Sequence, residues 1–221
     1  MKFRAIIFDL DGTIADNGTL WKDATKNLLT TRGIEISDHE IEKIDKQLCG
    51  IGMFNSCSLL KEKFNLQDSV KDLVTEKRQQ ACDLYAQNLK FVSGFEQFYQ
   101  KVSALKLKTA VATSSAREAL ITARAELNLD HFFGQHIYDI ALVGDRAKPD
   151  PAVYLYAAEK VGVSPTHCIA IEDSPVGITA AQNAGMFCIG INTAGMPQKI
   201  QHADLVINSY DQINLENLLG T

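Results

Sequence analysis

The sequence has no apolar run that approaches the roughly 18 residues of a membrane-spanning helix. The apolar stretch near the amino terminus follows the basic residues Lys2 and Arg4, but it ends at Asp9, too soon for the hydrophobic region of a secretory signal. Internal repeats and low-complexity tracts are also missing. These absences predict a globular protein of the cytoplasm.

An excess of positive charge is missing as well. The 22 lysines and arginines are outnumbered by 27 aspartates and glutamates, so the formal net charge is −5. Nucleic acids and anionic membranes attract basic proteins, and this charge argues against either of them as the main partner. It stays compatible with a small anion that is held by a local positive site.

Cysteine pairs with a metal-site or redox-motif spacing are missing, because the five cysteines include no CxxC pair and no zinc-site spacing. We interpret them as reduced thiols that mostly fill the core. Hydrophobic residues make up 46% of the chain and charged residues 22%, which is typical of an ordinary globular domain. A length of 221 residues accommodates one large domain, or a core domain with a smaller insert.

Three stretches of the chain differ in their apolar spacing. Residues 3–12, FRAIIFDLDG, form a β-branched apolar run that predicts a buried strand followed by a loop. Residues 16–90 have the spacing of helices and contain no convincing strand. From about residue 91 onward, short apolar runs alternate with helices, which is typical of a parallel sheet covered on both faces.

The first strand must join that sheet, because a lone strand cannot bury both of its faces. We therefore predict an α/β fold with a doubly wound parallel sheet, formed by residues 1–14 and 92–221. An all-α domain, residues 15–91, is inserted after the first strand.

Two capping boxes predict helix starts, one at Ser37 with Glu40 and one at Ser115 with Glu118. Along DSVKDLVTEKRQQACDLYAQNL, apolar residues recur at helical spacing and predict the core of a bundle. The charged residues between them, Lys77 included, are expected to face water.

Polar side chains follow four of the predicted strands, at the point where each apolar run stops. In an open parallel sheet, ligands bind at the carboxyl ends of the strands, so these residues are expected to converge on one site. Two aspartates on the first strand are two positions apart and would point the same way, which requires a cation or a proton to offset their repulsion. The candidates are Asp9, Asp11, Gly12, Thr113, Ser114, Lys148, Glu172 and Asp173.

Each of these residues, taken singly, has an ordinary structural explanation. Asp11 and Gly12 could form a turn after a strand, and Lys148 before a proline could be a solvated loop lysine. Glu172 and Asp173 could be the acidic start of a helix, where they favour the helix dipole. Only the joint occurrence of all four groups outweighs these explanations.

Four segments occur in order along the chain: DLDGT, VATSS, AKPDP and IEDSPVGITAAQNAGM. Together they resemble the motifs of the haloacid dehalogenase superfamily of phosphohydrolases, in the branch with a helical cap after the first strand. The chain looks similar to the β-phosphoglucomutase and phosphoglycolate phosphatase types within that branch. The resemblance covers residues 1–14 and about 92–221, whereas the cap resembles the family in placement and helicity alone.

The resemblance implies a role for each site residue. Asp9 would be the nucleophile that attacks phosphorus to give an aspartyl-phosphate. Asp11 would donate a proton to the leaving alkoxide and then activate the water that hydrolyses this intermediate. Asp9, Asp173 and the backbone carbonyl of Asp11 would hold Mg²⁺. Glu172 would either ligate the ion directly or contact and orient the residues that ligate it.

Other positions are implied to hold the phosphoryl group. Thr113 and the amides of Ser114 and Asp11 would cradle its oxygens, and Lys148 would neutralise the charge that develops during transfer. Gly12 would let the backbone come close to the phosphate. The implied cofactor is Mg²⁺, whose charge offsets the repulsion between the two aspartates of the first motif.

We expect a Mg²⁺-dependent phosphatase that acts on a small phosphomonoester, with a phosphosugar mutase of the β-phosphoglucomutase type as the alternative. Such mutases have a cap histidine where this chain has Trp21, and a basic residue in a cap loop where the segment around Gly50 and Gly52 has none. The mutase stays open because basic cap residues could reach inward, although we expect water exposure for Lys61, Lys63, Lys77 and Arg78.

Two further functions are disfavoured. The dehalogenase reaction attacks carbon and needs no metal, so the presence of Asp11 and Asp173 argues against it. A non-catalytic binding module has no support, because no motif residue is missing. The expected partner is a small phosphorylated metabolite, and the expected assembly is a monomer or a weak homodimer.

The cap is expected to select the substrate, because the core motifs handle only the phosphoryl group. The candidate inner surface of the cap is apolar, which predicts a leaving group with little charge rather than a bisphosphate. Packing within the cap bundle explains Trp21 and Phe54 at least as well. This surface comprises Trp21, Cys49, Ile51, Met53 and Phe54.

Overall fold

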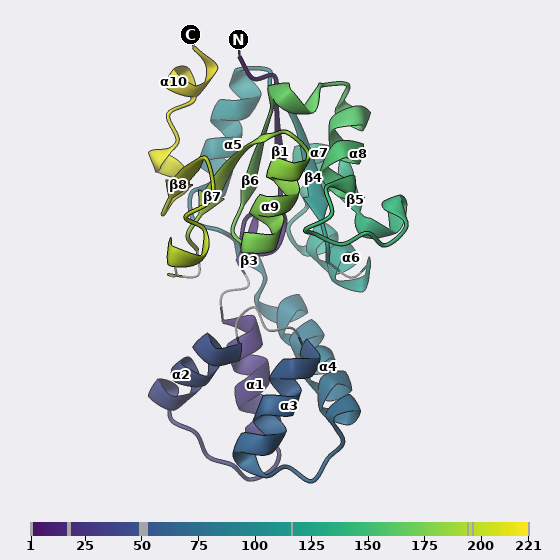
Figure 1. The fold of residues 1–221 in the computed structure, drawn as a ribbon, viewed down its shortest axis with the longest axis vertical. Helices are drawn as coiled ribbons and strands as arrows, with labels where there is room; N and C mark the ends of the chain where they lie inside the picture. Colours follow the sequence, from purple (N-terminus) through teal and green to yellow (C-terminus); the bar gives the residue numbers. More distant parts are fainter. Residues whose placement is uncertain are drawn as a thin grey trace. The chain divides into compact units, whose positions relative to one another are not determined.

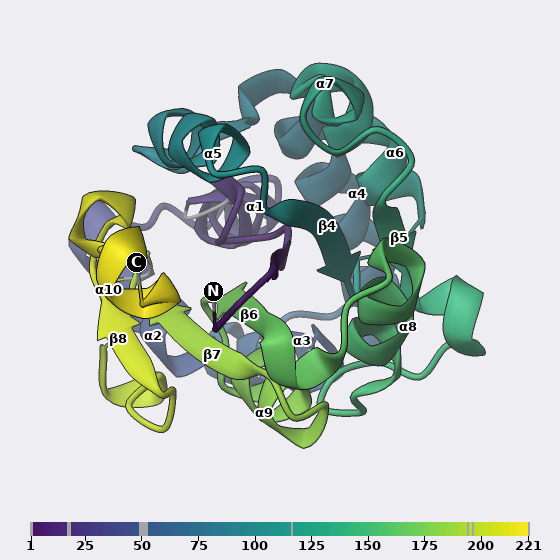
Figure 2. The same cartoon turned by 90° about the horizontal axis from the view of Figure 1, so that it is seen from above.

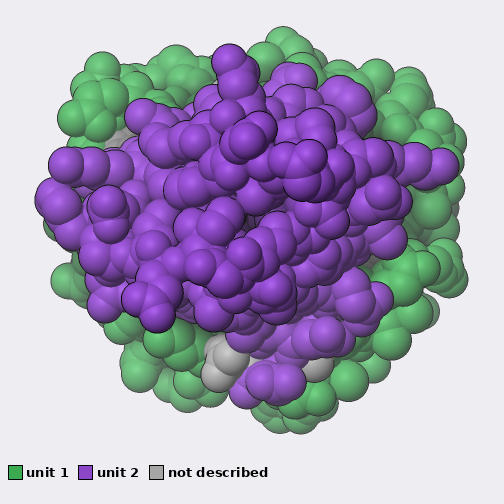
Figure 3. All heavy atoms as spheres, turned by 90° about the horizontal axis from the view of Figure 1, so that it is seen from below, with its two compact units in different colours: residues 1–16, 89–221 green, residues 17–88 purple. Residues whose placement is uncertain are grey.

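The protein divides into two compact units (Figure 3). Unit 1 comprises residues 1–16 and 89–221, and unit 2 comprises residues 17–88. These junctions differ by two and three residues from the predicted insert, residues 15–91. A computed structural model describes residues 2–16, 19–48, 53–115, 117–193, 195 and 197–220.

Unit 1 contains a six-stranded parallel sheet with the strand order β5-β4-β1-β6-β7-β8 (Figures 1 and 2). The predicted α/β fold with a doubly wound parallel sheet is confirmed, and the first strand lies in the middle of that sheet. The strands are β1 Ala5–Phe8, β4 Lys108–Thr113, β5 Ile137–Asp139, β6 Cys168–Glu172, β7 Phe187–Ile191 and β8 Leu205–Ile207.

Helices cover both faces of this sheet, with α8 and α9 on one face and α5 and α7 on the other (Figure 2). Short 3₁₀ turns connect several of the elements. The helices are α5 Phe95–Ala104, α6 Arg117–Glu126, α7 Leu129–Phe133, α8 Ala152–Val161, α9 Pro175–Asn183 and α10 Leu215–Leu219. The 3₁₀ turns are η1 Ile140–Val143, η2 Pro165–His167, η3 Pro197–Lys199 and η4 Tyr210–Gln212.

The strands of unit 1 are buried on both faces, as their nearly continuous apolar sequences predict. Ile7 lies in the cluster that includes residues of α8 and α9, while its neighbour Phe8 packs its ring against Phe95 and Phe133, at 5.7 Å between centroids in each case. Burial of a side chain of this size contributes roughly 1.5–3 kcal/mol. Packing on both sides therefore holds β1 in the centre of the sheet.

The register of the sheet decides which strand ends meet. Phe8 is paired with Val111 of β4 on one side and with Ile171 of β6 on the other. The next residue, Asp9, continues this pairing, because its amide donates to the carbonyl of Ile171 at 3.0 Å. The residues that follow β4 and β6 therefore flank Asp9 at the carboxyl edge of the sheet.

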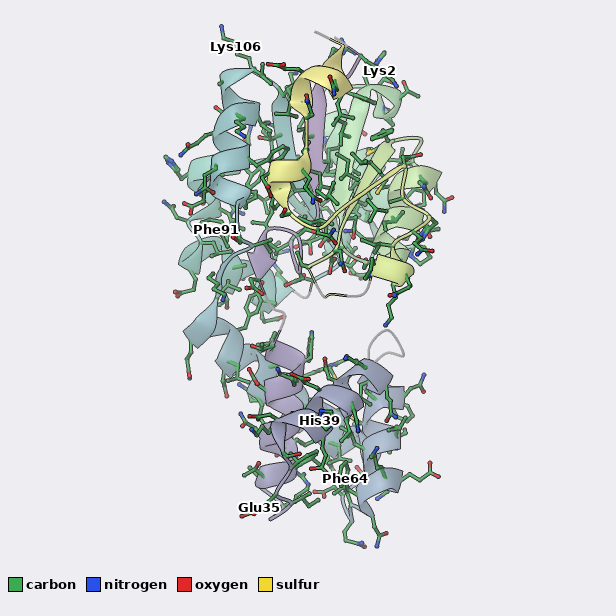
Figure 4. All side chains as sticks on the ribbon, turned by 90° about the vertical axis from the view of Figure 1, so that its left-hand side faces the viewer. Lys2, Glu35, His39, Phe64, Phe91 and Lys106 are labelled. Carbon is green, nitrogen blue, oxygen red and sulfur yellow. The ribbon has the colours of Figure 1, made fainter. Side chains whose placement is uncertain are left out.

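Two very short strands stand at the junctions between the units, and the sequence did not predict them. Ala15–Asp16 (β2) and Lys90–Phe91 (β3) form an antiparallel pair. The ring of Phe91 (labelled in Figure 4) also stacks on Phe95 of α5, with centroids 5.1 Å apart. Pairs of two residues carry no period that a sequence pattern could reveal.

All regular elements among the described residues of unit 2 are helices, in agreement with the predicted all-α segment. The capping box at Ser37 is present, since the Ser37 amide donates to Glu40 Oε2 at 3.2 Å and the Glu40 amide donates to Ser37 Oγ at 3.3 Å. Phe64 (labelled in Figure 4) packs against an apolar core that includes Leu28, Leu60 and Leu73. The helices are α1 Leu20–Thr30, α2 Asp38–Leu48, α3 Met53–Phe64 and α4 Val70–Asn88.

The expected exposure of the basic cap residues is wrong at Lys77. Lys63 and Arg78 are exposed, whereas Lys77 is buried, with 3% of its surface accessible. Lys77 is four residues from both Leu73 and Ala81, which places it on the buried face of α4. Burial lowers the pKa of Lys77. Lys61 is half-buried and donates to the backbone carbonyls of Leu66 and Asp68.

Four cysteines lie among the described residues, and all four are free thiols. Cys57, Cys168 and Cys188 are buried, as expected of core thiols, whereas Cys82 is exposed. Among the helices that the structure describes, none is both long and apolar enough to cross a membrane.

Candidate active site

Three charged side chains meet at the carboxyl edge of the sheet. Lys148 Nζ lies 2.5 Å from Asp9 Oδ1 and 2.6 Å from Glu172 Oε1. The side chains of Asp9, Lys148 and Glu172 are 10%, 4% and 0% exposed. Residues that are 139 positions apart in sequence therefore form one buried ionic cluster.

The surroundings of Lys148 fix its ammonium group in place. Lys148 Nζ also donates to the carbonyl of Ala112 at 2.9 Å, and it lies 4.8 Å from the centre of the Tyr154 ring. The backbone amide of Lys148 donates to Ser114 Oγ at 3.2 Å. Burial by itself lowers the pKa of Lys148, but the charges of Asp9 and Glu172 outweigh that effect and raise it. Lys148 therefore stays charged inside the protein.

Both carboxylate oxygens of Glu172 accept hydrogen bonds from the protein. Oε1 accepts from Lys148 and, at 2.7 Å, from the hydroxyl of Tyr154. Oε2 accepts from the amide and the hydroxyl of Ser174, at 3.4 and 3.1 Å. A β-carbon at Gly177, in the first turn of α9, would lie 2.0 Å from this carboxylate, so the glycine leaves room for it. Glu172 could either bind the metal ion directly or hold the residues that bind it. These contacts favour the second role.

Asp173 brings a further carboxylate to the same place. One oxygen from each of Asp9, Glu172 and Asp173 lies within 4.8 Å of the others. Gly12 lies against Asp173, because a β-carbon at position 12 would be 2.1 Å from Asp173 Oδ2. Gly12 also has a φ of +79°, a conformation that favours glycine. Close approach and backbone conformation therefore both require glycine here.

The charges of this cluster do not balance, because one lysine faces three carboxylates. Burial raises the pKa of Asp9 to about 8, and the neighbouring charge of Glu172 adds to the effect. Burial and the charge of Asp9 also raise the pKa of Asp173 well above its usual value. A divalent cation would offset this repulsion, and an all-oxygen donor set suits Mg²⁺. The donor chemistry therefore fits the implied ion.

A second group of side chains surrounds Asp11. The hydroxyl of Ser115 donates to Asp11 Oδ2. The amide of Ser115 donates to Thr113 Oγ1 at 2.9 Å, and the two hydroxyl oxygens lie 2.8 Å apart. The prediction that Ser115 caps a helix together with Glu118 missed this contact, and no hydrogen bond between those two is found among the described residues. The signal in the sequence for a contact between Ser115 and the site was the pair of serines, Ser114 and Ser115, directly after a strand.

All eight predicted site residues are thus linked by contacts within unit 1. Tyr154 and Ser115 belong to the same network, although the sequence analysis did not assign them to the site. In unit 2, Trp21 and Phe54 are 41% and 63% exposed, so packing inside the bundle does not account for them fully. Cys49 and Ile51 lie outside the described residues.

Comparisons with known proteins find similar sequences and a similar fold. The sequence model of a family described as Haloacid dehalogenase-like hydrolase matches residues 6–191. The phosphorylated carbohydrates phosphatase of Thermotoga maritima is 26% identical over 185 residues, 82% of each chain. The β-phosphoglucomutase of Bacillus subtilis is 28% identical over 220 residues, 97% of this chain and 93% of that protein.

A solved structure shows the same fold. The crystal structure of a conserved haloacid dehalogenase-like protein from Agrobacterium tumefaciens aligns with a TM-score of 0.83 and 25% sequence identity. The alignment covers 99% of this chain and 98% of that one. The likeness therefore extends over the whole length of both chains.

Proposed function

The chain belongs to the haloacid dehalogenase-like hydrolases, as a hydrolase of phosphoric monoesters, and from this premise we propose a Mg²⁺-dependent reaction through an aspartyl-phosphate. The observation that carries the proposal is the buried cluster in which Lys148 holds one oxygen of Asp9, beside the carboxylate of Asp173. A carboxylate that is oriented and paired in this way can act as a nucleophile on phosphorus.

In the first step, an oxygen of Asp9 bonds to phosphorus while the bond from phosphorus to the leaving oxygen breaks. Asp11 donates a proton to that leaving oxygen, which departs as an alcohol. In the second step, Asp11 takes a proton from a water molecule that attacks the same phosphorus. The bond from phosphorus to the Asp9 oxygen breaks, so inorganic phosphate leaves and the Asp9 carboxylate is restored.

The remaining side chains of the network orient these groups. Ser115 donates to the carboxylate of Asp11, and Thr113 contacts the amide and the hydroxyl of Ser115. Lys148 supplies positive charge next to the phosphoryl group, and Glu172 with Tyr154 keeps its ammonium in position. Preorganised charge of this kind needs no rearrangement during the reaction, which is why it accelerates the transfer.

The residues that would hold Mg²⁺ are Asp9 and Asp173, with the backbone carbonyl of Asp11 and with Glu172 behind them. When bound, the ion supplies positive charge that keeps the carboxylates ionised and neutralises phosphate oxygens. Removal of Mg²⁺ by a chelator is expected to abolish turnover reversibly.

We propose a small phosphorylated metabolite as the substrate, with a leaving group that carries little charge. The phosphorylated carbohydrates phosphatase among the relatives supports this proposal. A phosphosugar mutase is the second candidate, because the similarity to a β-phosphoglucomutase extends over 97% of the chain. In that reaction, a sugar hydroxyl would take the phosphoryl group from Asp9 in place of water.

A phosphate-release screen with Mg²⁺ tests both candidates. The panel contains sugar monophosphates, phosphoglycolate, nucleotides and glycerol phosphates, and one arm contains β-glucose 1-phosphate with its bisphosphate activator. Release of phosphate by the wild type, and its loss in Asp9→Asn, would support hydrolysis. Isomerisation of β-glucose 1-phosphate without net release of phosphate would support the mutase. Preference for a sugar bisphosphate would contradict the proposed low charge of the leaving group.

A further inference from the structure

Two side chains from the carboxyl-terminal part of the chain hold the loop that carries Asp11. Thr193, which follows β7, donates from Oγ1 to the backbone carbonyl of Gly12 at 2.7 Å. Tyr210, the first residue of η4, donates from its hydroxyl to the backbone carbonyl of Thr13 at 2.9 Å. Two consecutive carbonyls directly after Asp11 are therefore bonded to residues about 180 or more positions away in sequence. We name Thr193 and Tyr210 the carboxyl-terminal clamp.

The loop uses its own amides for internal hydrogen bonds. The amides of Ile14 and Ala15 donate to the carbonyl of Leu10 at 2.9 and 2.8 Å, and the amide of Gly12 donates to the carbonyl of Ala15 at 2.8 Å. These bonds make a tight turn, whose carbonyls at positions 12 and 13 point outward to the clamp. Thr13 is fully buried, so its carbonyl has no easy access to water. A buried carbonyl that loses its donor costs about 1–3 kcal/mol.

Tyr210 is well suited to hold a fixed position. The residue is 1% exposed, and its ring stacks on Phe98 with centroids 5.1 Å apart. The ring also meets Phe95 edge-on at 5.9 Å. Burial raises the pKa of Tyr210 well above its ordinary value, with further contributions from the charges of Asp9 and Asp173. The phenol therefore stays protonated and remains a hydrogen-bond donor.

We propose that Tyr210 and Thr193 are positioning residues, which set the location of the Asp11 carboxylate for proton transfer to the leaving oxygen. This inference rests on the proposed function, because it assigns the clamp to the acid step of that reaction. The backbone of Gly12 and Thr13 continues directly from Asp11, so a shift of these peptides moves the carboxylate. The hydrogen bond from Ser115 would then have to stretch or turn.

The variant Tyr210→Phe tests the proposal, because it keeps the ring in its aromatic cluster and removes only the hydroxyl. Thr193→Val removes the other donor, whereas Thr193→Ser keeps a hydroxyl and is expected to retain the wild-type rate. Tyr99→Phe is the matched control, because the Tyr99 hydroxyl also donates to a backbone carbonyl, that of Phe132, away from the Asp11 loop.

Single-turnover release of the leaving group is the measurement, with an alkyl phosphate and with p-nitrophenyl phosphate. For the alkyl phosphate we expect Tyr210→Phe to lower the rate of leaving-group release about tenfold. This is a part of the ~10²–10⁴-fold acceleration that proton transfer contributes. p-Nitrophenolate leaves without help from an acid, so its release should change much less. Equal losses with both esters, or the same loss in Tyr99→Phe, would overturn the proposal.

Native-state hydrogen exchange at the amides of residues 13–15 provides a readout that needs no turnover. Faster exchange in Tyr210→Phe, with unchanged exchange in α8, supports the clamp even if the wild type hydrolyses no phosphomonoester. Faster exchange in Tyr210→Phe together with a wild type that hydrolyses no phosphomonoester would refute the proposed function but not the clamp. Unchanged exchange at residues 13–15 would refute the clamp, whatever the activity of the protein.

Discussion

Replacement of Lys148 by methionine removes the ammonium group that two buried carboxylates share. Asp9 Oδ1 and Glu172 Oε1 lie 2.5 and 2.6 Å from Lys148 Nζ, and neither carboxylate side chain is more than 10% exposed. Methionine keeps most of the length of the apolar stem, so the change in volume is small. The main effect of Lys148→Met is therefore electrostatic.

The magnitude follows from the burial of the cluster. Loss of one partner from a buried ion pair costs about 3–5 kcal/mol, because the other charge is left without compensation. We expect Lys148→Met to lower the free energy of unfolding of unit 1 by this amount in Mg²⁺-free buffer at pH 9, above the pKa of about 8 of Asp9. Glu172→Gln in the same chain removes one of the unpaired charges and should restore about half of the loss. The penalty should shrink at lower pH, because a buried carboxylate without its cation takes up a proton.

Hydrogen exchange at the amides of β1 and β6 is the appropriate assay, since a chain of two units need not unfold in one transition. Lys160→Met is the matched control. Lys160 pairs with Glu159 at 3.4 Å, and these side chains are 42% and 72% exposed. Exposed pairs of this kind contribute about 0–1 kcal/mol.

Two results would refute the reasoning. The first is a decrease in the free energy of unfolding in Lys148→Met that is no larger than the decrease in Lys160→Met. In that case Lys148 does not stabilise the cluster. The second is a Lys148→Met, Glu172→Gln double variant that is less stable than Lys148→Met alone. In that case the two charges are not coupled as their distances indicate.

Three further predictions follow from the same contacts. The pKa of Asp9 is raised from 3.8 to about 8, so between these pH values the metal-free folded protein binds more protons than the unfolded chain. The free energy of unfolding should therefore fall as pH rises through this range. A free energy of unfolding that does not change with pH in the presence of a chelator would contradict this. Gly12→Ala places a β-carbon 2.1 Å from Asp173 Oδ2 and adds roughly 1–2 kcal/mol of left-handed backbone strain. The control is Gly94→Ala, where φ is also positive, at +85°, but the nearest atom to the new β-carbon is 3.5 Å away. Calorimetry should show weaker Mg²⁺ binding in Gly12→Ala than in Gly94→Ala. Asp11→Asn should slow release of an alkyl leaving group by ~10²–10⁴-fold in a single turnover, and a loss below tenfold would exclude it as the acid.

The central strands β1 and β6 of unit 1 could be predicted from the sequence, because strands buried on both faces need nearly continuous apolar residues. The segments AIIF and CIAIE satisfy this requirement, and both are buried over their whole length. The site residues could be predicted for a related reason, since polar side chains that directly follow such runs must lie at the edge of the sheet. Asp9 and Asp173 are examples, one directly after each of these two strands.

Other features could not be predicted, because they depend on partners that are remote in sequence. The helical pattern of α4 marks position 77 as a buried position, yet the residue there is lysine, and its charge led to the opposite prediction. Ser115 fits a helix cap equally well by local pattern, and only the distance to Asp11 decides its role. Tyr154 follows a helix start and has no polar neighbour in sequence that would mark it as the partner of Glu172.

The sequence by itself determined the parallel sheet, the position of the helical insert and the residues that gather at the strand ends, because apolar period and chain order carry that information. The tertiary structure alone decided how these residues are arranged: Lys148 between Asp9 and Glu172, Ser115 on Asp11, and Tyr210 on the carbonyl of Thr13. The physical reason is the short range of hydrogen bonds and ion pairs. Such contacts exist only within roughly 3–4 Å, and the pairing register of the strands sets separations on that scale.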